Sequence, residues 1–462
     1  MFNLEKYKNN IAIISDAGKK LTYAQLQEEA DKLKPSMKKG ELAFCLCTNT
    51  PACIAGYVAL LQSGVATVLL DAHKDKELLS RLLNLYQPNL IWAPAEEEWG
   101  EVKAETDDYR LYRYSDKQHT IHPDVALLLT TSGSTGSPKL VKLTERNITS
   151  NAEAIAEYLR ITENERPITT LPMYYSFGMS VINSHLIKGA TILLTDATIM
   201  QKEFWNFLKE GKATSIAGVP YTYEMLRRLR FFRMDLPYLK TMIQAGGKLN
   251  AEIVKEFVTD SQAKGREFIV MYGQTEASPR MSWLPFEHAL DKYASIGIAI
   301  PGGKLSVRDG NDLEITEPNV DGELIFEGPG VSMGYAECPE DLAREDENHG
   351  LLHTGDVARY DEDGYFYITG RMKRFVKIWG NRCNLDATEQ LVKAITTNCA
   401  CVGVDDKITV FVTEDGLKEQ IVKHLSEKMG LHSSAFAVQV IAEIPKKDTG
   451  KINYPALQAL IS

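Results

Sequence analysis

Short apolar runs alternate with amphipathic segments through the first third of the chain. The strand-like runs are ELAFCLC (41–47), ATVLLD (66–71) and LIWAP (90–94). Between them, 23–34 and 76–86 carry apolar residues at helical spacing, and Thr22 is placed to cap the first of these helices. This alternation of strands and helices predicts a parallel sheet and an α/β fold.

The middle of the chain repeats this pattern. Its strand-like runs are ATILLTD (190–196), KATSIAGV (212–219), LKTMIQAGG (239–247) and REFIVMYG (266–273). Gly, Asp or Tyr stands at or next to the end of each run. Because ligands of open α/β sheets bind beyond the carboxyl ends of the strands, we expect binding residues at these positions.

The pattern changes near Ser295 to short alternating runs separated by Gly, Pro and Asp-Gly turns, which predict hairpins of a β-rich part over about 295–370. After a short basic connector, Arg371 to Arg374, about 90 residues return to mixed helix and strand, enough for a separate small domain. We therefore expect a large multi-sheet N-terminal domain, 1–370, and a small mobile α+β domain, 371–462.

Composition narrows the function classes. The chain has 462 residues, of which 44% are hydrophobic and 25% charged, and its formal net charge is −10. This balance argues against a nucleic-acid partner. The longest apolar window, 54–70, is interrupted by polar residues and too short to cross a bilayer, and the first ten residues lack the apolar core of a signal peptide. We expect a cytoplasmic protein with no membrane span.

The seven cysteines are scattered, and their spacing argues against disulfides and a zinc site. Cys45 and Cys47 lie on one face of the strand predicted over 41–47. Buried thiols there behave as small hydrophobic side chains, so we interpret both as core residues.

The segment LLLTTSGSTGSPKLVK (127–142) joins an apolar strand to a loop of glycines and hydroxyl residues that ends in Pro-Lys. Backbone N–H groups, hydroxyls and Lys139 could hold phosphate oxygens there. The loop is not a Walker A motif, in which Ser or Thr follows the Lys. The alternative is a flexible Ser/Gly turn.

This loop resembles the phosphate-loop signature of the adenylate-forming (AMP-binding) superfamily, which includes acyl-CoA synthetases, luciferases and peptide-synthetase adenylation domains. Five further segments continue the resemblance in order: AGGKL (245–249), MYGQTEA (271–277), HTGD (353–356), ITGRMKRFVKIWGNR (368–382) and IPKKDTGKI (444–452). The family implies that ATP and a carboxylic acid bind between a large N-terminal and a small C-terminal domain.

The resemblance assigns roles to single residues. Tyr272 would stack on adenine, Thr275 would contact the α-phosphate, and Glu276 would help to hold Mg²⁺. Asp356 would bind the ribose hydroxyls and Arg371 the same sugar or the phosphates. The remaining ATP-binding residues implied are Thr131, Ser132, Gly133, Ser134, Thr135, Gly136, Lys139, Gly246, Gly247 and Gly273.

By the same resemblance, Lys451 is the catalytic lysine, which would offset the charge that develops when a carboxylate attacks the α-phosphate. Lys373 falls at the hinge position between the domains, and Lys377 and Gly380 border the thiol tunnel. A basic linker that stays solvated is the alternative for this run, and it is the interpretation we adopt for Arg374.

The acid pocket departs from the family pattern. Tyr175 stands where acyl-CoA-forming relatives often have His, and Gly178 stands at or near an Asp that pairs with the α-ammonium in amino-acid-activating relatives. Tyr175, Phe177, Gly178 and Gly218 are the pocket residues we expect. Because a buried ammonium without a counter-charge is costly, the sequence predicts a carboxylic acid substrate without an α-amine.

The expected function is a two-step ligation. Carboxylate and Mg-ATP give acyl-adenylate and pyrophosphate, and a thiol then takes the acyl group. The implied ligands are ATP, Mg²⁺ and coenzyme A, or alternatively the phosphopantetheine arm of an acyl carrier protein. A non-catalytic nucleotide-binding scaffold is the alternative of another class, and retention of the residues assigned above argues against it. A Rossmann oxidoreductase is disfavoured because no G-x-G-x-x-G follows a strand.

Overall fold

The computed structural model describes residues 2–73, 76–106, 108–130, 139–372, 374–379, 381–404, 406–447 and 451–461. The chain forms two compact units. The first contains 1–293, 297–305 and 326–352, and the second contains 294–296, 306–325 and 353–462. The domain boundary expected near Arg371 stays a prediction.

The first sheet of the first unit has parallel strands at its centre, as the alternation predicts. Strands β3, β4, β5 and β8 pair in parallel, and antiparallel strands flank them on both sides. In sheet order the strands are β19 (Tyr335–Ala336), β9 (Leu140–Thr144), β8 (Val125–Thr130), β4 (Ala66–Asp71), β3 (Leu42–Cys47), β5 (Leu90–Pro94), β7 (Tyr109–Arg113) and β6 (Glu101–Glu105).

Four helices lie before, between or after these strands along the chain. They are α1 (Tyr23–Leu33), α2 (Pro51–Gln62), α3 (Lys76–Tyr86) and α4 (Glu145–Tyr158). Thr22 caps α1 as predicted: its hydroxyl accepts from the Gln25 backbone N–H, and the Gln25 side chain accepts from the Thr22 N–H. The apolar window 54–70 is divided between α2 and β4, as expected for a helix that runs into a buried strand.

The second sheet collects the strands predicted in the middle of the chain. In sheet order they are β16 (Ile298–Ala299), β15 (Arg280–Trp283), β14 (Glu267–Gly273), β13 (Thr241–Gln244), β12 (Ser215–Gly218), β10 (Pro167–Ile168), β11 (Ile192–Leu194), β1 (Ile11–Ser15) and β2 (Lys20–Thr22). Pairing is parallel from β1 to β14 and antiparallel at both edges.

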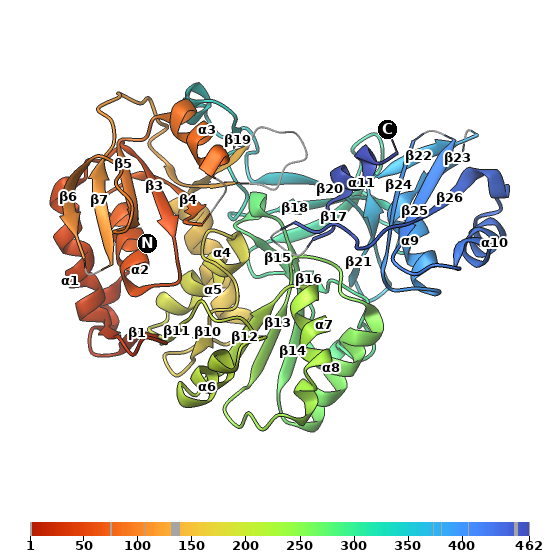
Figure 1. Ribbon diagram of the computed structural model, residues 1–462, viewed down its shortest axis with the longest axis horizontal. Helices are drawn as coiled ribbons and strands as arrows, with labels where there is room; N and C mark the ends of the chain where they lie inside the picture. Colours follow the sequence, from red (N-terminus) through yellow and green to blue (C-terminus); the bar gives the residue numbers. More distant parts are fainter. Residues whose placement is uncertain are drawn as a thin grey trace. The chain divides into compact units, whose positions relative to one another are not determined.

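The helices of this half are α5 (Ser176–Leu186), α6 (Lys202–Glu210), α7 (Pro220–Arg228) and α8 (Ala251–Ala263). Helices α4 and α5 lie between the two sheets, and α7 and α8 lie beside β13 and β14 (Figure 1). One apolar core unites side chains of both sheets with Ile148 of α4 and with Met179 and Ile182 of α5. Burial of this interface fixes α5, whose residues are all buried.

Most of the second unit is built from the hairpins and small domain that the sequence predicts. One sheet orders β17 (Lys304–Arg308), β18 (Gly322–Glu327), β20 (Leu351–Tyr360) and β21 (Phe366–Arg371). Beyond it come the hairpin β22 (Phe375–Ile378) and β23 (Asn381–Asn384), and the sheet β24 (Cys399–Val404), β25 (Lys407–Val412) and β26 (Phe436–Val440). Helices α9 (Leu385–Lys393), α10 (Lys418–Met429) and α11 (Tyr454–Ala459) pack in this unit.

Among the described residues, no helix is both long enough and apolar enough to cross a membrane.

Candidate active site

Predicted site residues of the first unit meet at the carboxyl end of β14. Tyr272 and Gly273 end the strand, and a 3-10 turn, Thr275–Ala277, follows at once. The Thr275 hydroxyl lies 3.0 Å from the hydroxyl of Ser176, the first residue of α5. These contacts place two hydroxyl groups at the sheet edge where α/β folds bind ligands.

Glu276 is held in the same turn. Its side chain accepts a hydrogen bond from the Tyr335 hydroxyl at 2.8 Å, and its backbone carbonyl accepts from the Ser332 N–H at 2.8 Å. A carboxylate oxygen of this kind suits Mg²⁺, which prefers oxygen ligands. Glu276 therefore fits the metal role that the family implies.

Tyr175 approaches the glycine pair that follows β13. Gly246 has a φ of +83°, and a Cβ added to it would lie 2.8 Å from the Tyr175 hydroxyl. A Cβ on Gly247 would lie 3.2 Å from Pro220. A larger residue at Gly246 would therefore strain the backbone and displace the tyrosine. Gly218 ends β12 and packs closely against Thr222. A Cβ added to Gly218 would lie 2.8 Å from the Thr222 side chain.

Gly178 has no room for any side chain. A Cβ there would lie 2.2 Å from the carbonyl oxygen of Pro172 and 2.9 Å from that of Leu171. The backbone of α5 thus packs directly on the preceding loop. An acidic residue at 178 would require this packing to open, so the structure adds a steric reason for the missing Asp.

Arg280 is a charged residue of this region that the sequence reasoning did not single out. It is 1% exposed, and its guanidinium lies 4.5 Å from the ring centroid of Phe177. Its Nε donates to the Ser180 hydroxyl at 3.2 Å, whereas Nη2 is buried without a hydrogen-bond partner. Burial lowers the pKa of Arg280 from its ordinary value. The only sequence signal was a charged residue that opens the apolar strand RMSW.

Tyr175 lies within the electrostatic reach of this cation. Burial raises the pKa of Tyr175 to about 12, and the charge of Arg280 opposes that rise. Tyr175 and Phe177 also contact each other edge to face, with their ring centroids 6.5 Å apart. Two of the predicted pocket residues therefore share one environment with a buried positive charge.

The predicted phosphate loop is described only at its end. Thr131, Ser132, Gly133, Ser134, Thr135 and Gly136 lie outside the described residues. Lys139 is described: it forms a 2.5 Å ion pair with Glu337, and its ammonium lies 5.7 Å from the Tyr335 ring centroid. Lys139 and Glu276 thus both contact Tyr335.

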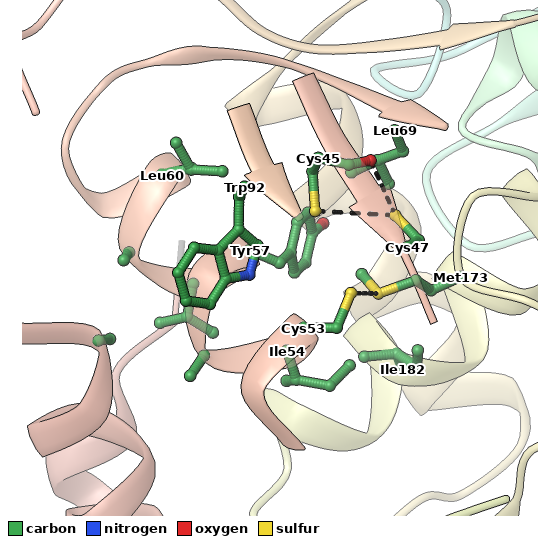
Figure 2. Close-up of a cluster of buried hydrophobic side chains, with 14 of the residues drawn as sticks. Cys45, Cys47, Cys53, Ile54, Tyr57, Leu60, Leu69, Trp92, Met173 and Ile182 are labelled. Carbon is green, nitrogen blue, oxygen red and sulfur yellow. Dashed lines mark hydrogen bonds between the residues drawn. The ribbon is translucent and has the colours of Figure 1, made fainter. Parts of the chain in front are cut away.

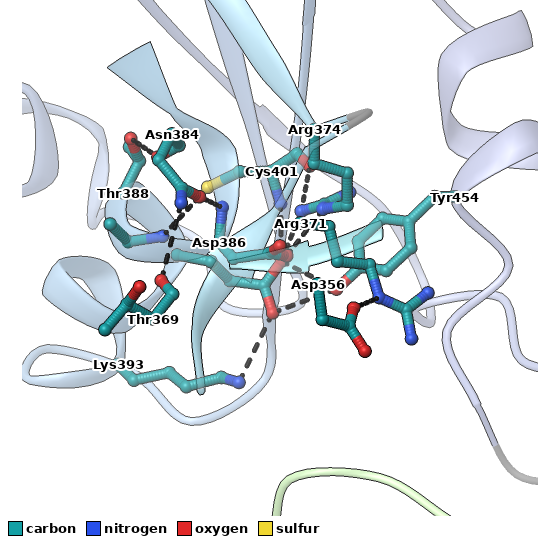
Figure 3. A network of polar contacts seen from close by, with 12 residues as sticks. Asp356, Thr369, Arg371, Arg374, Asn384, Asp386, Thr388, Lys393, Cys401 and Tyr454 are labelled. Atoms are coloured by element: carbon teal, nitrogen blue, oxygen red, sulfur yellow. Dashed lines mark hydrogen bonds and ion pairs between the residues drawn. The ribbon is translucent and has the colours of Figure 1, made fainter. Parts of the chain in front are cut away.

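In the second unit, Asp356 and Arg371 form an ion pair. The two residues face each other in the register of β20 and β21, and Arg371 Nε lies 2.9 Å from Asp356 Oδ1 (Figure 3). Asp356 is buried, whereas the Arg371 side chain is 61% exposed. Thr354, the second residue of HTGD, accepts from the Asp356 N–H and donates to the Leu324 carbonyl. These hydrogen bonds hold the backbone at Asp356, and the ion pair with Arg371 orients its carboxylate.

Lys451 lies near the end of the chain, next to residues 448–450, which are outside the described residues. Its carbonyl accepts from the Lys447 N–H at 2.8 Å, and Lys446 forms a bridge with Ile452. The side chain of Lys451 is exposed. Burial, and secondarily the charge of Arg371, lower the pKa of Lys447. Lys447 and Arg371 thus lie close enough for their positive charges to interact.

Of the predicted hinge and tunnel residues, Lys373 and Gly380 lie outside the described residues. Lys377 is described by its backbone, which pairs with Arg382 in the β22–β23 hairpin. Their roles remain predictions.

The interpretation of Arg374 as a solvated linker residue is wrong. Its side chain is only 12% exposed, and its Nε lies 2.5 Å from Asp386 (Figure 3). Its guanidinium carbon lies 3.6 Å from the ring centroid of Tyr454, which donates to the Glu389 carboxylate at 3.0 Å. Arg374 is therefore a core residue that ties β22 to α9 and α11.

Comparison with known proteins supports the resemblance to the adenylate-forming enzymes. The profile of the AMP-binding enzyme family matches residues 2–336. Feruloyl-CoA synthase of Amycolatopsis sp is 27% identical over 470 residues, covering 95% of this chain and 94% of that protein. The long-chain-fatty-acid–CoA ligase of Yersinia pestis is 30% identical over 358 residues, covering 73% of this chain and 61% of the ligase.

Solved structures share the fold. The o-succinylbenzoate CoA synthetase of Bacillus subtilis, solved with its acyl-adenylate intermediate, has a TM-score of 0.80 at 20% identity, over 99% of this chain and 98% of that one. ATP-bound MatB of Rhodopseudomonas palustris has a TM-score of 0.79 at 21% identity, over 98% and 95%. The predicted α/β multi-sheet fold is confirmed. The family profile matches most of the length of this chain. The chain therefore belongs to the AMP-binding enzymes and is an AMP-forming acid–thiol ligase, which activates a carboxylic acid as an acyl-adenylate.

Proposed function

We propose that the enzyme joins a carboxylic acid without an α-amine to coenzyme A. In the first half-reaction a carboxylate oxygen attacks the α-phosphorus of ATP, and pyrophosphate leaves. In the second, the thiol sulfur attacks the acyl carbonyl, AMP leaves and the thiol proton passes to solvent. The CoA ligases among the relatives, such as feruloyl-CoA synthase, support coenzyme A as the acceptor.

The observation that carries this proposal is the pair of hydroxyls at the end of β14. Thr275 and Ser176 lie 3.0 Å apart beside Glu276, where they can donate to an anionic phosphate or carboxylate. Preorganised donors of this kind stabilise charge that develops in a transition state. Glu276 would hold Mg²⁺, which when bound neutralises charge on the polyphosphate.

Two features support an acid without an α-amine. Gly178 leaves no space for an acidic side chain. Arg280 adds a buried positive charge under Phe177, and among the described residues no carboxylate is found to act on it. An ammonium group bound beside this guanidinium would be repelled, because two like charges interact strongly in a buried environment. A carboxylate would be attracted.

The roles of the second unit complete the proposal. Asp356 and Arg371 would bind the ribose and phosphates, and Lys451 would offset charge on the reacting carboxylate and the pyrophosphate. Lys373 would act as the hinge for rotation of the small domain between the half-reactions, and Lys377 and Gly380 would border the path of the thiol.

In the first unit, adenine would stack on Tyr272 beside Gly246 and Gly247. The enzyme would act in the cytoplasm.

The test is acid-dependent release of pyrophosphate over short, medium, long and aromatic acids, run with coenzyme A and with a carrier protein. We expect activation of carboxylic acids and poor activation of the matching α-amino acids. A proteinogenic amino acid as the best substrate would contradict the proposal, and acylation of the carrier protein but not of coenzyme A would replace the acceptor. Arg280→Met should raise KM for the acid. The control is Arg266→Met, which also removes a buried guanidinium with an unpartnered N–H and should leave KM for the acid unchanged.

A further inference from the structure

Four sulfur atoms from three chain segments converge in the core of the first unit. Cys45 and Cys47 point from one face of β3, Cys53 lies in the first turn of α2, and Met173 precedes α5 (Figure 2). All four side chains are buried. The sequence analysis placed Cys45 and Cys47 in the core, and this is confirmed, but it did not bring Cys53 and Met173 to them.

The spacing of these sulfurs suits a single metal ion. The three cysteine sulfurs all lie within 4.8 Å of one another, and those of Cys45 and Cys47 are 3.7 Å apart. The Cys53 sulfur lies 3.4 Å from that of Met173. A metal that binds sulfur at about 2.3 Å holds its ligating sulfurs about 3.8 to 4.0 Å apart. Shifts of a few tenths of an ångström would therefore complete a coordination sphere.

The chemistry of the donors selects the metal. The set consists of thiols and a thioether, which are soft ligands that prefer Cu(I) over Mg²⁺, Ca²⁺ or Mn²⁺. If one of the three thiols keeps its proton, two thiolates and one Cu(I) leave a single negative charge in the core; with all three deprotonated the charge is −2.

A partly exposed loop lies next to the cluster along the chain. Cys47 ends β3, and Thr48, Asn49 and Thr50, each half-buried, lead from it to α2. This loop stands at the carboxyl end of a parallel strand, the edge at which α/β sheets bind ligands. We propose that Cys45, Cys47, Cys53 and Met173 form a Cu(I)-binding site, separate from the adenylation chemistry.

The test measures Cu(I) binding without oxygen, in competition with the chromophoric chelator bicinchoninate. The full-length wild type should bind one Cu(I) per chain, with only sulfur in the first shell by X-ray absorption. Cys47→Ser and Cys53→Ser should each weaken binding about tenfold or more, an effect expected when a ligand or its support is lost. The matched control is Cys401→Ser, because Cys399 and Cys401 have the same C-x-C spacing on a strand and are also buried.

Met173→Leu keeps the volume of the core and should weaken Cu(I) binding without lowering the melting temperature, so the test does not depend on folding of the serine variants. Met179→Leu, at another buried methionine, should change neither. Wild-type binding no tighter than that of Cys53→Ser, loss of copper in Cys401→Ser, or a preference for Zn(II) would overturn the proposal. None of these outcomes depends on the ligase assay.

Discussion

Asp356 and Arg371 face each other across the β20–β21 hairpin, with a buried carboxylate oxygen 2.9 Å from an exposed guanidinium nitrogen. The exposed arginine can turn toward a ligand, whereas the aspartate is buried and its backbone N–H is held by the Thr354 hydroxyl. The pair therefore offers one fixed acceptor and one adaptable donor, a combination suited to a ribose and its phosphates.

Asp356→Asn keeps the size of the side chain and removes its charge. We expect KM for ATP to rise about ten- to a hundredfold, the effect of losing hydrogen bonds to a charged group. Steady-state kinetics with ATP varied measures it. Asp415→Asn, at an exposed loop position of the same unit, is the control and should behave as wild type. An unchanged KM in Asp356→Asn would remove the ribose assignment.

Lys451→Ala should reduce adenylate formation by about a hundred- to a thousandfold, the usual effect of removing one preorganised charge. Because the side chain is exposed, the melting temperature should not change. Pyrophosphate release is compared with that of Lys423→Ala, which removes an exposed lysine of α10. Undiminished pyrophosphate release from a folded Lys451→Ala protein would contradict the assignment of Lys451 as the catalytic lysine.

Gly178→Ala should destabilise the fold by about 1–3 kcal/mol, because its Cβ would overlap the Pro172 carbonyl. Gly178→Asp should be worse and should not create amino-acid activation. Urea unfolding gives the free-energy change. At Gly310, where a Cβ meets nothing within 4 Å, substitution by Ala provides the control. An unchanged free energy of unfolding in Gly178→Ala would contradict the close packing of α5 on the Pro172 carbonyl.

His185 links stability to pH. Burial lowers its pKa to about 4, and its Nδ1–H donates to the Val181 carbonyl at 2.7 Å. Below about pH 6.5 the unfolded chain takes up a proton that the folded chain refuses, so the free energy of unfolding should fall by up to about 3 kcal/mol between pH 6.5 and 4. Comparing this slope with that of His185→Gln isolates the histidine. Equal slopes in both proteins would contradict the burial of a neutral ring.

The strands predicted in the first two thirds of the chain, the helices over 23–34 and 76–86 and the cap at Thr22 could be predicted because they depend on local periodicity. Arg374 was misread for the opposite reason. Its partners Asp386, Glu389 and Tyr454 lie 12, 15 and 80 positions away along the chain, and no spacing rule links them. The burial of Arg280 against Phe177 and the approach of Cys53 to Cys45 likewise arise only when separate elements pack.

The motifs of the active site were easier to find than its contacts. HTGD and MYGQTEA name Asp356 and Thr275, but the Ser176 hydroxyl that lies beside Thr275 comes from a helix 99 positions earlier. The lack of space at Gly178 is also invisible in the sequence, because the obstructing atom is a backbone carbonyl oxygen. Sequence motifs name the candidate site residues, and tertiary packing determines which side chains surround them.

The most direct test of the central claim follows the nucleotide products of the purified enzyme with ATP, Mg²⁺, coenzyme A and the best acid of the panel. The account predicts AMP and pyrophosphate in equal amounts, together with an acyl-CoA of the expected mass, and no turnover when the acid is omitted. Formation of ADP and phosphate, or nucleotide turnover that does not depend on the acid, would contradict it.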